Sequence, residues 1–132
     1  MANYAGTATF FNNCDASHRG ACGTCYSDQG GVAYPHLVGF PGDYSAGCVA
    51  GGGMVALHCG DYITLGNFCS GQVPYLFAPI VDHGPGAACT LDTLCGIPTS
   101  FGYRLLDLTP VTYANIGGDP LAGHVAVNIA TP

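Results

Sequence analysis

Glycine and proline interrupt this sequence every few residues, and their spacing restricts the possible folds more than any other feature. The 132 residues include 21 Gly and 9 Pro, and both residue types break or end regular secondary structure. Long helices are therefore excluded almost everywhere. Between the breaks lie short runs rich in β-branched and aromatic residues, which is the composition of strands. The sequence predicts an all-β fold built from short strands.

Six runs have the length and composition of strands. They are Thr7–Phe11, Met54–His58, Tyr62–Leu65, Pro74–Val81, Arg104–Leu108 and His124–Ile129. Asp28–Gly53 and Gly84–Gly102 are predicted as long connections, which usually carry function or need cross-links. No repeat, linker or change of composition divides the chain, so we expect residues 1–132 to form one closed or nearly closed domain.

One short helix is indicated near the C-terminus, in "LDLTPVTYANIGG". Thr109 is a good N-cap, and Pro110 suits the first helical position. Gly117 supplies the left-handed residue that ends a helix. Asp107 is therefore expected at the end of a strand, just before a helix of about two turns.

The chain contains eight cysteines. They are Cys14, Cys22, Cys25, Cys48, Cys59, Cys69, Cys89 and Cys95. An even number in a short, loop-rich chain indicates a disulfide framework and therefore an oxidising, extracellular setting. Eight cysteines allow about 105 complete pairings, and we expect Cys89 and Cys95 to form a local bridge.

The spacing of Cys22 and Cys25 also occurs in zinc sites. A zinc knuckle needs a second close pair of ligands, and His18 supplies only one candidate. A redox role for this spacing would need a βαβ context, which is missing. Structural disulfides are the better interpretation, and we expect neither a metal nor a cofactor.

Charge excludes two classes of partner. All eight acidic residues are Asp, there is no Lys, and the only Arg residues are Arg19 and Arg104, which gives a net charge of -6. Nucleic acids and anionic membrane surfaces both require clustered basic residues. No apolar run approaches the length of a transmembrane helix. The N-terminal "MANYAGTATFF" lacks the basic start and apolar core of a signal peptide, so we expect a mature, soluble, secreted protein.

Three segments share their pattern and order with known proteins. They are "GTATFF" with "GACG" (Gly20–Gly23), "VALHCGDYITL" leading into "IVDHGPG", and "LLDLTPVTYANIGG" with "GHVAVNI". The first resembles the opening of expansin-type domains. The second is similar to the Ala-Ala-His strand and Asp-Arg-Gly-Pro turn of rare lipoprotein A, and the third to the Leu-Asp-Leu-Ser helix start and closing strand found across the group. The chain thus resembles the double-psi β-barrel superfamily of expansins, loosenins and rare lipoprotein A, with residues 28–53 poorly matched.

The resemblance implies a fold and a groove. The expected fold is a disulfide-linked, six-stranded double-psi β-barrel with one short helix and an open groove on one face. In bacterial expansins the groove carries a Thr on the first strand, an Asp before the psi turn and an Asp before the helix. Thr9, Asp82 and Asp107 occupy the matching positions here. The pattern also has an aromatic residue shortly after the first Asp, where this chain has Gly84.

Hydrolysis of a polysaccharide by inversion needs one carboxyl group as acid and another as base. Asp107 and Asp82 are the candidate catalytic residues. In the family-45 endoglucanases, which share this barrel, the acid matches Asp107 and the base lies on the first strand, where this chain has Asn12. An amide cannot serve as that base, and Asp15 is the only nearby substitute. Classical hydrolysis is therefore disfavoured.

Lytic cleavage of peptidoglycan, as in relatives of rare lipoprotein A, is a second enzymatic alternative. That family pattern carries a Glu in a Ser-Gly-Glu stretch, whereas this chain has no Glu and reads "GCVAGGG" in the corresponding region. His58 matches the family's His, but His83 replaces the usual Arg. This activity is less well supported.

Non-hydrolytic binding and loosening of cell-wall polysaccharide is the function that we expect. Cellulose, chitin and peptidoglycan all remain possible partners. Carboxylates form strong hydrogen bonds with hydroxyl-rich ligands, and aromatic rings supply flat contact surfaces. The expected polysaccharide contacts are Thr9, Asn12, His83 and Tyr103, and Tyr4, Phe11 and Tyr44 are further candidate platforms.

Structural roles and other functions remain open. Asp82 is also suited to binding the amides of its Gly-Pro turn, and Asp107 to binding backbone donors near the helix start. Double-psi barrels also include protease inhibitors and barwin-like defence proteins, for which the two long connections would form the binding surface. The low charge and the cysteines are equally compatible with a self-assembling extracellular subunit, so the sequence leaves the oligomeric state undetermined.

Overall fold

The computed structural model describes residues 3–11, 20–23, 30–40, 54–84, 93–98 and 104–132. The elements in chain order are β1 (Asn3–Phe10), β2 (Val32–Tyr34), β3 (Tyr62–Asn67), β4 (Leu76–His83), β5 (Thr93–Leu94), β6 (Ile97–Pro98), β7 (Arg104–Leu108), α1 (Pro110–Asn115) and β8 (His124–Ala130). The predicted all-β fold with one short helix is confirmed.

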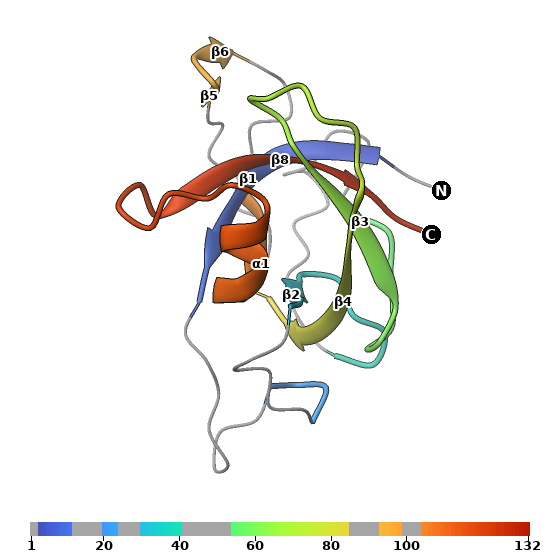
Figure 1. The fold of residues 1–132 in the computed structure, drawn as a ribbon. Helices are drawn as coiled ribbons and strands as arrows, with labels where there is room; N and C mark the ends of the chain where they lie inside the picture. The colour runs from blue at the N-terminus through green and yellow to red at the C-terminus, as the bar shows by residue number, and fades with distance from the viewer. Residues whose placement is uncertain (1–2, 12–19, 24–29, 41–53, 85–92, 99–103) are drawn as a thin grey trace.

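Six of these strands form a closed barrel in the order β1-β7-β2-β4-β3-β8 (Figure 1). The β1–β7 and β2–β4 pairs are parallel, and the other neighbours are antiparallel. Strands β5 and β6 form a separate two-stranded hairpin. Because the parallel partners are far apart in sequence, the barrel places short segments from both halves of the chain side by side.

Strand β2 corrects the sequence-based prediction, which placed Val32–Tyr34 inside a long connection. The strand has only three residues and all are buried, so it shows no alternating pattern. It nevertheless pairs with both β4 and β7. A strand this short, between Gly31 and Pro35, gives too little local signal to be recognised.

The predicted strand at Met54–His58 is also wrong. Only Leu57 pairs, in an isolated bridge with Leu37, and Val55 and Ala56 are both exposed. Two adjacent exposed residues cannot satisfy the alternation of a half-buried strand. The second predicted connection also needs correction, because the β5–β6 hairpin lies within it.

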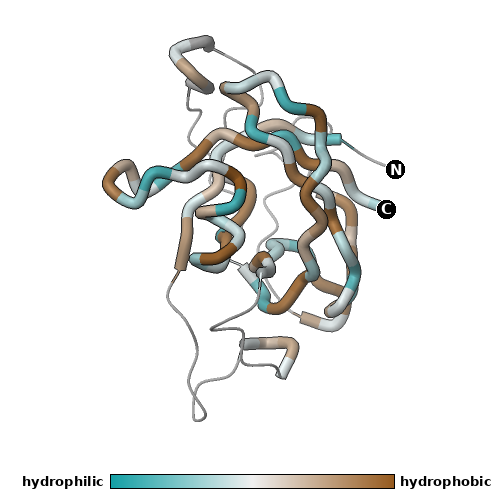
Figure 2. Tube along the Cα trace, viewed as in Figure 1, coloured by the Kyte–Doolittle hydropathy of each residue, from teal (hydrophilic) through white to brown (hydrophobic). Residues whose placement is uncertain are grey.

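The barrel interior is filled by alternate residues of the strands. Ile63 and Leu65 of β3, Ala78 and Ile80 of β4, and Val127 and Ile129 of β8 are all at most 1% exposed, and Figure 2 shows hydrophobic residues recurring along these strands. The residues between them face outward. Tyr62 on the outer face of β3, Phe77 on the outer face of β4 and Tyr75, just before β4, are exposed.

Helix α1 begins and ends as predicted. Thr109 is the N-cap and accepts a hydrogen bond from the Thr112 backbone N–H, with Pro110 following it. Gly117 has a φ of 88° just after the last turn. The ring of Tyr113 lies 4.6 Å from that of Phe10, measured between centroids. This contact fixes the helix against the end of β1.

Two disulfides join the described segments, Cys22–Cys59 and Cys69–Cys95. The predicted Cys89–Cys95 bridge is therefore wrong, because Cys95 pairs with a residue of the β3–β4 connection. Because Cys22 is disulfide-bonded, it is not a zinc ligand. The other four cysteines, Cys14, Cys25, Cys48 and Cys89, lie outside the described residues. Within the described part of the chain, no helix is long and apolar enough to cross a membrane.

Candidate functional site

Strand pairing aligns Thr9, Asp107 and Asp82 across the barrel. Thr9 of β1 is opposite Asp107 of β7, and Asp107 is opposite Ala33 of β2. Ala33 is in turn opposite Asp82 of β4. We call these four residues the Asp row. Three sites that are distant in sequence therefore lie along one line across four adjacent strands.

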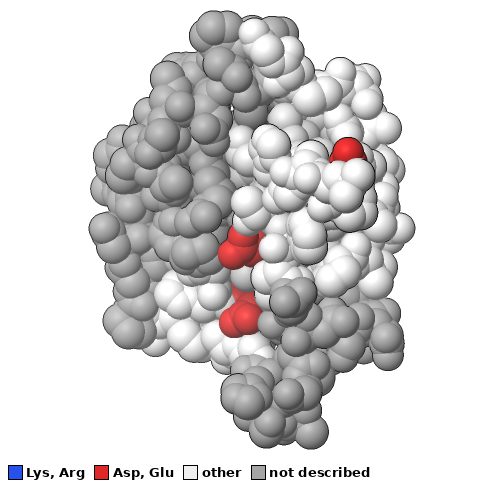
Figure 3. All heavy atoms as spheres, turned by 90° about the vertical axis from the view of Figure 1, so that its left-hand side faces the viewer, with Lys and Arg blue, Asp and Glu red and all other residues white. Residues whose placement is uncertain are grey.

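The Asp row lies on the outside of the barrel. Leu106 and Leu108, on either side of Asp107, belong to the core, so the Asp107 side chain points outward. Ala33 separates the two aspartates, so their Cα atoms are about 10 Å apart, two strand spacings. Figure 3 shows two acidic residues close together near the middle of one face.

Asp107 is positioned by Thr9. The Thr9 hydroxyl donates a hydrogen bond to Asp107 Oδ1, and both residues are half-buried. Asp107 Oδ2 makes no hydrogen bond within the described residues. This oxygen is therefore an acceptor with a fixed direction, suited to a ligand hydroxyl.

Asp82 holds a neighbouring turn. Its Oδ1 accepts hydrogen bonds from the backbone N–H groups of Ala21, at 2.7 Å, and His83, at 2.8 Å. Ala21 precedes Cys22, which is bonded to Cys59. Asp82 thus attaches the Gly20–Gly23 turn to the barrel beside the row. The local geometry gives it a structural task that Asp107 does not have.

His83 follows Asp82 and turns toward the loop after β2. Its Nε2 lies 3.0 Å from the Pro35 carbonyl oxygen, and because that oxygen can only accept, Nε2 carries the proton. The imidazole centroid lies 5.6 Å from the Phe40 ring. His83 is therefore held near the row, but by contacts with the barrel itself.

Gly84 explains one departure from the expansin pattern. A Cβ atom at this position would lie 2.9 Å from the Ala33 carbonyl oxygen. Real Cβ atoms essentially never come that close to backbone atoms, so an aromatic side chain at Gly84 does not fit unless β2 moves. The surface beside Ala33 consequently has no aromatic wall at this position.

His124 extends the row and was missed by the sequence analysis. It is the β8 partner of Thr9 and its side chain is exposed. Its Nδ1 lies 3.0 Å from the Ala122 carbonyl oxygen, which requires a proton on Nδ1 and leaves Nε2 of the neutral ring as an acceptor. Only the antiparallel register places His124 here, so no local motif signals it.

The other residues named from the sequence are elsewhere or not described. Tyr4 packs partly against the core, and its hydroxyl accepts a hydrogen bond from the Val55 N–H at 2.9 Å. His58 is exposed, 3.6 Å from the Asp61 carboxylate. The half-buried Phe11 directly follows β1, and its N–H donates to the Leu108 carbonyl. The predicted positions outside the described residues are Asn12, Asp15, Tyr44 and Tyr103.

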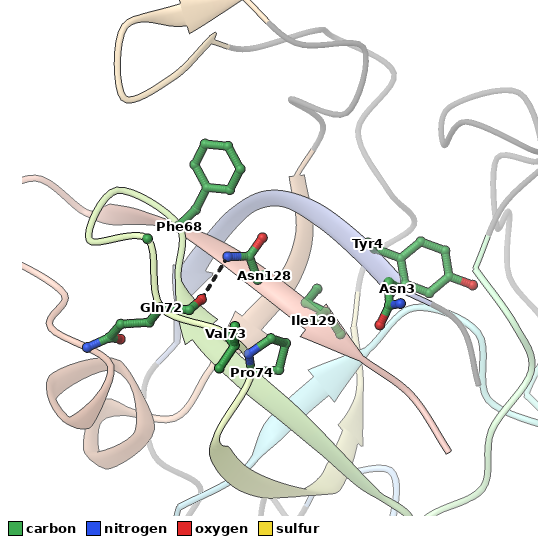
Figure 4. A pocket seen from close by; sticks show the side chains of 9 residues that line it. Asn3, Tyr4, Phe68, Gln72, Val73, Pro74, Asn128 and Ile129 are labelled. Atoms are coloured by element: carbon green, nitrogen blue, oxygen red, sulfur yellow. Dashed lines mark hydrogen bonds between the residues drawn. The ribbon is translucent and has the colours of Figure 1, made fainter.

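A cavity of about 420 Å³ lies farther along the β1–β8 face (Figure 4). Its lining includes Tyr4 of β1 and Phe68 of the β3–β4 connection, with Asn128 between them in the view. The Asn128 amide donates to the Gln72 carbonyl at 3.0 Å. The Asn128 amide, a main polar group of this cavity, is therefore already bonded to the β3–β4 connection.

Comparison with known proteins identifies the fold. No family model and no curated protein sequence matches the chain. Among solved structures, an apo form of Clavibacter michiganensis expansin matches with a TM-score of 0.54 and 17% identity, over 99% of this chain and 50% of that chain. An aspartate-to-asparagine variant of the same expansin, in complex with cellohexaose, matches with a TM-score of 0.52, 16% identity and the same coverage. The barrel is therefore an expansin-like double-psi β-barrel, and the chain spans about half the length of these expansin chains.

Proposed function

We propose that this protein binds a cell-wall polysaccharide through the Asp row and loosens it without classical hydrolysis. The observation that carries the proposal is the alignment of Thr9, Asp107 and Asp82 across adjacent strands. Asp107 is the main ligand-binding group, Thr9 orients it, and Asp82 holds the adjoining turn.

The chemistry of the row suits sugar hydroxyl groups. A carboxylate that accepts a hydrogen bond from a hydroxyl group forms a short, charge-assisted bond. Asp107 Oδ2 is available for such a bond because the Thr9 hydroxyl occupies Oδ1. Ala33 between the aspartates is only 4% exposed, so a ligand on the row would contact the half-buried Asp107 and Asp82 rather than Ala33.

The similar expansin supports the choice of ligand class, because one of its structures contains cellohexaose. The disulfides joining the described segments favour a secreted protein acting outside the cell.

The arrangement of the carboxylates supports binding more than cleavage. Inverting hydrolysis needs a base that is available to activate water. Asp82 Oδ1 already accepts two backbone hydrogen bonds, and the first-strand position of the expected base is occupied by Asn12. We therefore expect no release of reducing ends from a bound oligosaccharide.

Titration calorimetry with soluble cellohexaose and chitohexaose tests the proposal. Asp107→Asn keeps the shape of the side chain but removes its charge, so we expect at least a tenfold loss of affinity, in line with a hydrogen bond to a charged group. Reducing-end assays on the same samples should detect no cleavage.

Phe77→Ser is the matched control for this experiment. Phe77 is 71% exposed on the outer face of β4, away from the row, so the variant removes nonspecific aromatic adsorption without altering the aspartates. We expect it to bind cellohexaose as the wild type does. Wild-type affinity in folded Asp107→Asn would contradict the site, and reducing ends that disappear in Asp107→Asn would show hydrolysis.

A further inference from the structure

A second polar cleft lies beside the His124 end of the row, on the same outer face of β1 and β8. It has a volume of about 340 Å³, and its lining includes Thr7, Asp119, His124 and the Cys69–Cys95 disulfide. We call it the Thr7 cleft. Thr7 and Thr9 are two residues apart on the same face of β1, about 7 Å along the strand, so the cleft continues the surface of the row.

The Thr7 hydroxyl is the strongest sign of a ligand. Thr7 is only 6% exposed, yet its side chain makes no hydrogen bond within the described residues. Buried polar groups without a partner are rare in folded proteins. Since Thr7 lines the cleft, its hydroxyl is placed to bond with a molecule that enters from outside.

Other polar atoms of the cleft have spare acceptor capacity. His124 Nδ1 donates to the Ala122 carbonyl, so Nε2 of the neutral ring accepts. Asp119 Oδ1 accepts from the Leu121 N–H at 2.9 Å, and Oδ2 makes no hydrogen bond within the described part of the chain. The cleft therefore matches a ligand that presents several hydroxyl donors.

Charge restricts the ligand further. Asp119 lies in the cleft and Asp107 and Asp82 lie on the adjoining row. Against these three carboxylates stands, among the described residues, one basic residue, Arg104, the β7 partner of Thr7, and the whole chain carries a net charge of -6. A glycan bearing carboxylates would be repelled at this surface, whereas a neutral glycan would not. Cellulose and chitin chains are neutral, and uronic acid or muramic acid polymers are anionic.

We propose that the Thr7 cleft is an additional subsite that binds one sugar unit of an uncharged polysaccharide lying along the Asp row. This inference rests on the proposed function and adds to it a second site and a ligand class. It favours neutral over anionic glycans as the principal ligand, because the carboxylates around the cleft and the row outnumber Arg104, the one basic residue that the structure describes there.

Thr7→Val tests the subsite. Valine has nearly the same shape and suits a strand, so the variant should fold. Because it removes a buried hydroxyl without a partner, we expect unchanged or higher stability to denaturant. Affinity for cellohexaose or chitohexaose should fall about three- to tenfold, the range for one lost hydrogen bond. If Thr7 had only a structural role, Thr7→Val would instead lower the stability and leave the affinity unchanged.

Three further arms complete the experiment. Thr7→Ser retains a hydroxyl and should restore most of the affinity. Thr64→Val removes a hydroxyl from the outer face of β3, outside the cleft, and should leave binding unchanged. Hexagalacturonate, an anionic oligomer, should bind the wild type at least tenfold more weakly than cellohexaose.

The outcomes separate the two proposals. If Asp107→Asn weakens binding while Thr7→Val binds hexaose like the wild type, the cleft proposal is overturned and the row stands. Hexagalacturonate binding as tight as cellohexaose binding overturns the neutral ligand class. If the wild type binds none of the oligosaccharides, both the proposed function and the cleft proposal are overturned.

Discussion

Asp82 and Asp107 are the same residue type on one face of the barrel, but their immediate surroundings give them different roles. The Asp82 carboxylate accepts two backbone N–H groups within 2.8 Å. Asp107 accepts from one side-chain hydroxyl, that of Thr9. Removing the Asp82 carboxylate takes away the acceptor of the half-buried His83 N–H and the hydrogen bond that attaches the Gly20–Gly23 turn to the barrel. Asp82 variants should therefore affect stability first, and Asp107 variants binding first.

Gly84→Ala tests how closely β2 packs against Gly84. In Gly84→Ala, the added Cβ would lie 2.9 Å from the Ala33 carbonyl oxygen, so β2 has to shift. Overpacking of this kind typically costs about 1–3 kcal/mol. We expect urea denaturation to show that loss of unfolding free energy, together with weaker cellohexaose binding because Ala33 lies between the two aspartates.

Gly23→Ala is the comparison variant, because it adds a methyl group that meets no neighbouring atom. No atom lies within 4 Å of a Cβ at Gly23, although its φ of 77° adds backbone strain. A Gly84→Ala protein as stable as the wild type would show that β2 is not packed against Gly84 in solution.

At the scale of elements, disulfides connect segments that the strand pairing alone leaves apart. Cys69 lies in the β3–β4 connection, and Cys95 lies between the two strands of the β5–β6 hairpin. The hairpin makes no ladder with the barrel among the described strands. Among the described residues, the Cys69–Cys95 bridge thus links the hairpin covalently to the β3–β4 connection beside the Thr7 cleft.

The double variant Cys69→Ser/Cys95→Ser should weaken the fold without abolishing it. The two cysteines are 26 residues apart, and a bridge closing a loop of this order contributes about 2–4 kcal/mol. We expect a loss of that size in guanidinium denaturation while the far-ultraviolet circular dichroism is retained. Mass spectrometry under non-reducing conditions verifies that the Cys22–Cys59 bridge stays intact, and a fully unfolded variant would contradict the prediction.

At the scale of the whole molecule, the core contains phenol groups that should make stability pH-dependent. Tyr34 is fully buried, and its hydroxyl donates to the Val55 carbonyl at 2.7 Å. Burial, with a smaller contribution from Tyr4, holds the pKa of Tyr34 well above its usual value. Burial, followed by the charge of Asp119, also raises the pKa of Tyr113. Both groups therefore favour the folded state while they are protonated.

The sign of the pH effect follows from these raised pKa values. The stability contribution is complete below the unfolded-state pKa of about 10, and it is lost as the pH rises toward the folded-state pKa. We expect the free energy of unfolding to stay level between pH 7 and 9 and to fall above about pH 10.

Tyr34→Phe identifies the group responsible. The variant should lose about 1 kcal/mol at pH 7 with its hydrogen bond and show a shallower decline above pH 10. Tyr62→Phe is the control, because Tyr62 is 56% exposed on the outside of the barrel. Identical alkaline slopes for wild type and Tyr34→Phe would refute the assignment.

Several parts of the fold follow from local sequence signals. Thr109, Pro110 and Gly117 specify the start and end of α1, because capping acts over a few residues. The strands β3, β7 and β8 lie close to the runs predicted for them, since alternation is a local pattern. Strand β2 was missed because both of its faces and both of its edges are covered by distant segments.

Some residues of the candidate site could likewise be predicted from the sequence, and others could not. Asp82 and Asp107 were chosen from the sequence through their resemblance to a family pattern, and the structure shows how close together they lie. His124 and Thr7 carry no motif, and neither was predicted from the sequence as a site residue. They acquire their positions from the register of β1 against β8, which is a property of the closed barrel.

The sequence by itself determined the all-β class, the short helix and the presence of a disulfide framework, because these depend on residue types and on spacing over a few positions. Only the tertiary structure decided the partners of Cys22, Cys69 and Cys95, the existence of β2, and the alignment of the Asp row with the Thr7 cleft. The physical reason is that side-chain alternation fixes which face a residue occupies within its own strand. The neighbour on the next strand is fixed by long-range pairing, which is settled when the barrel closes.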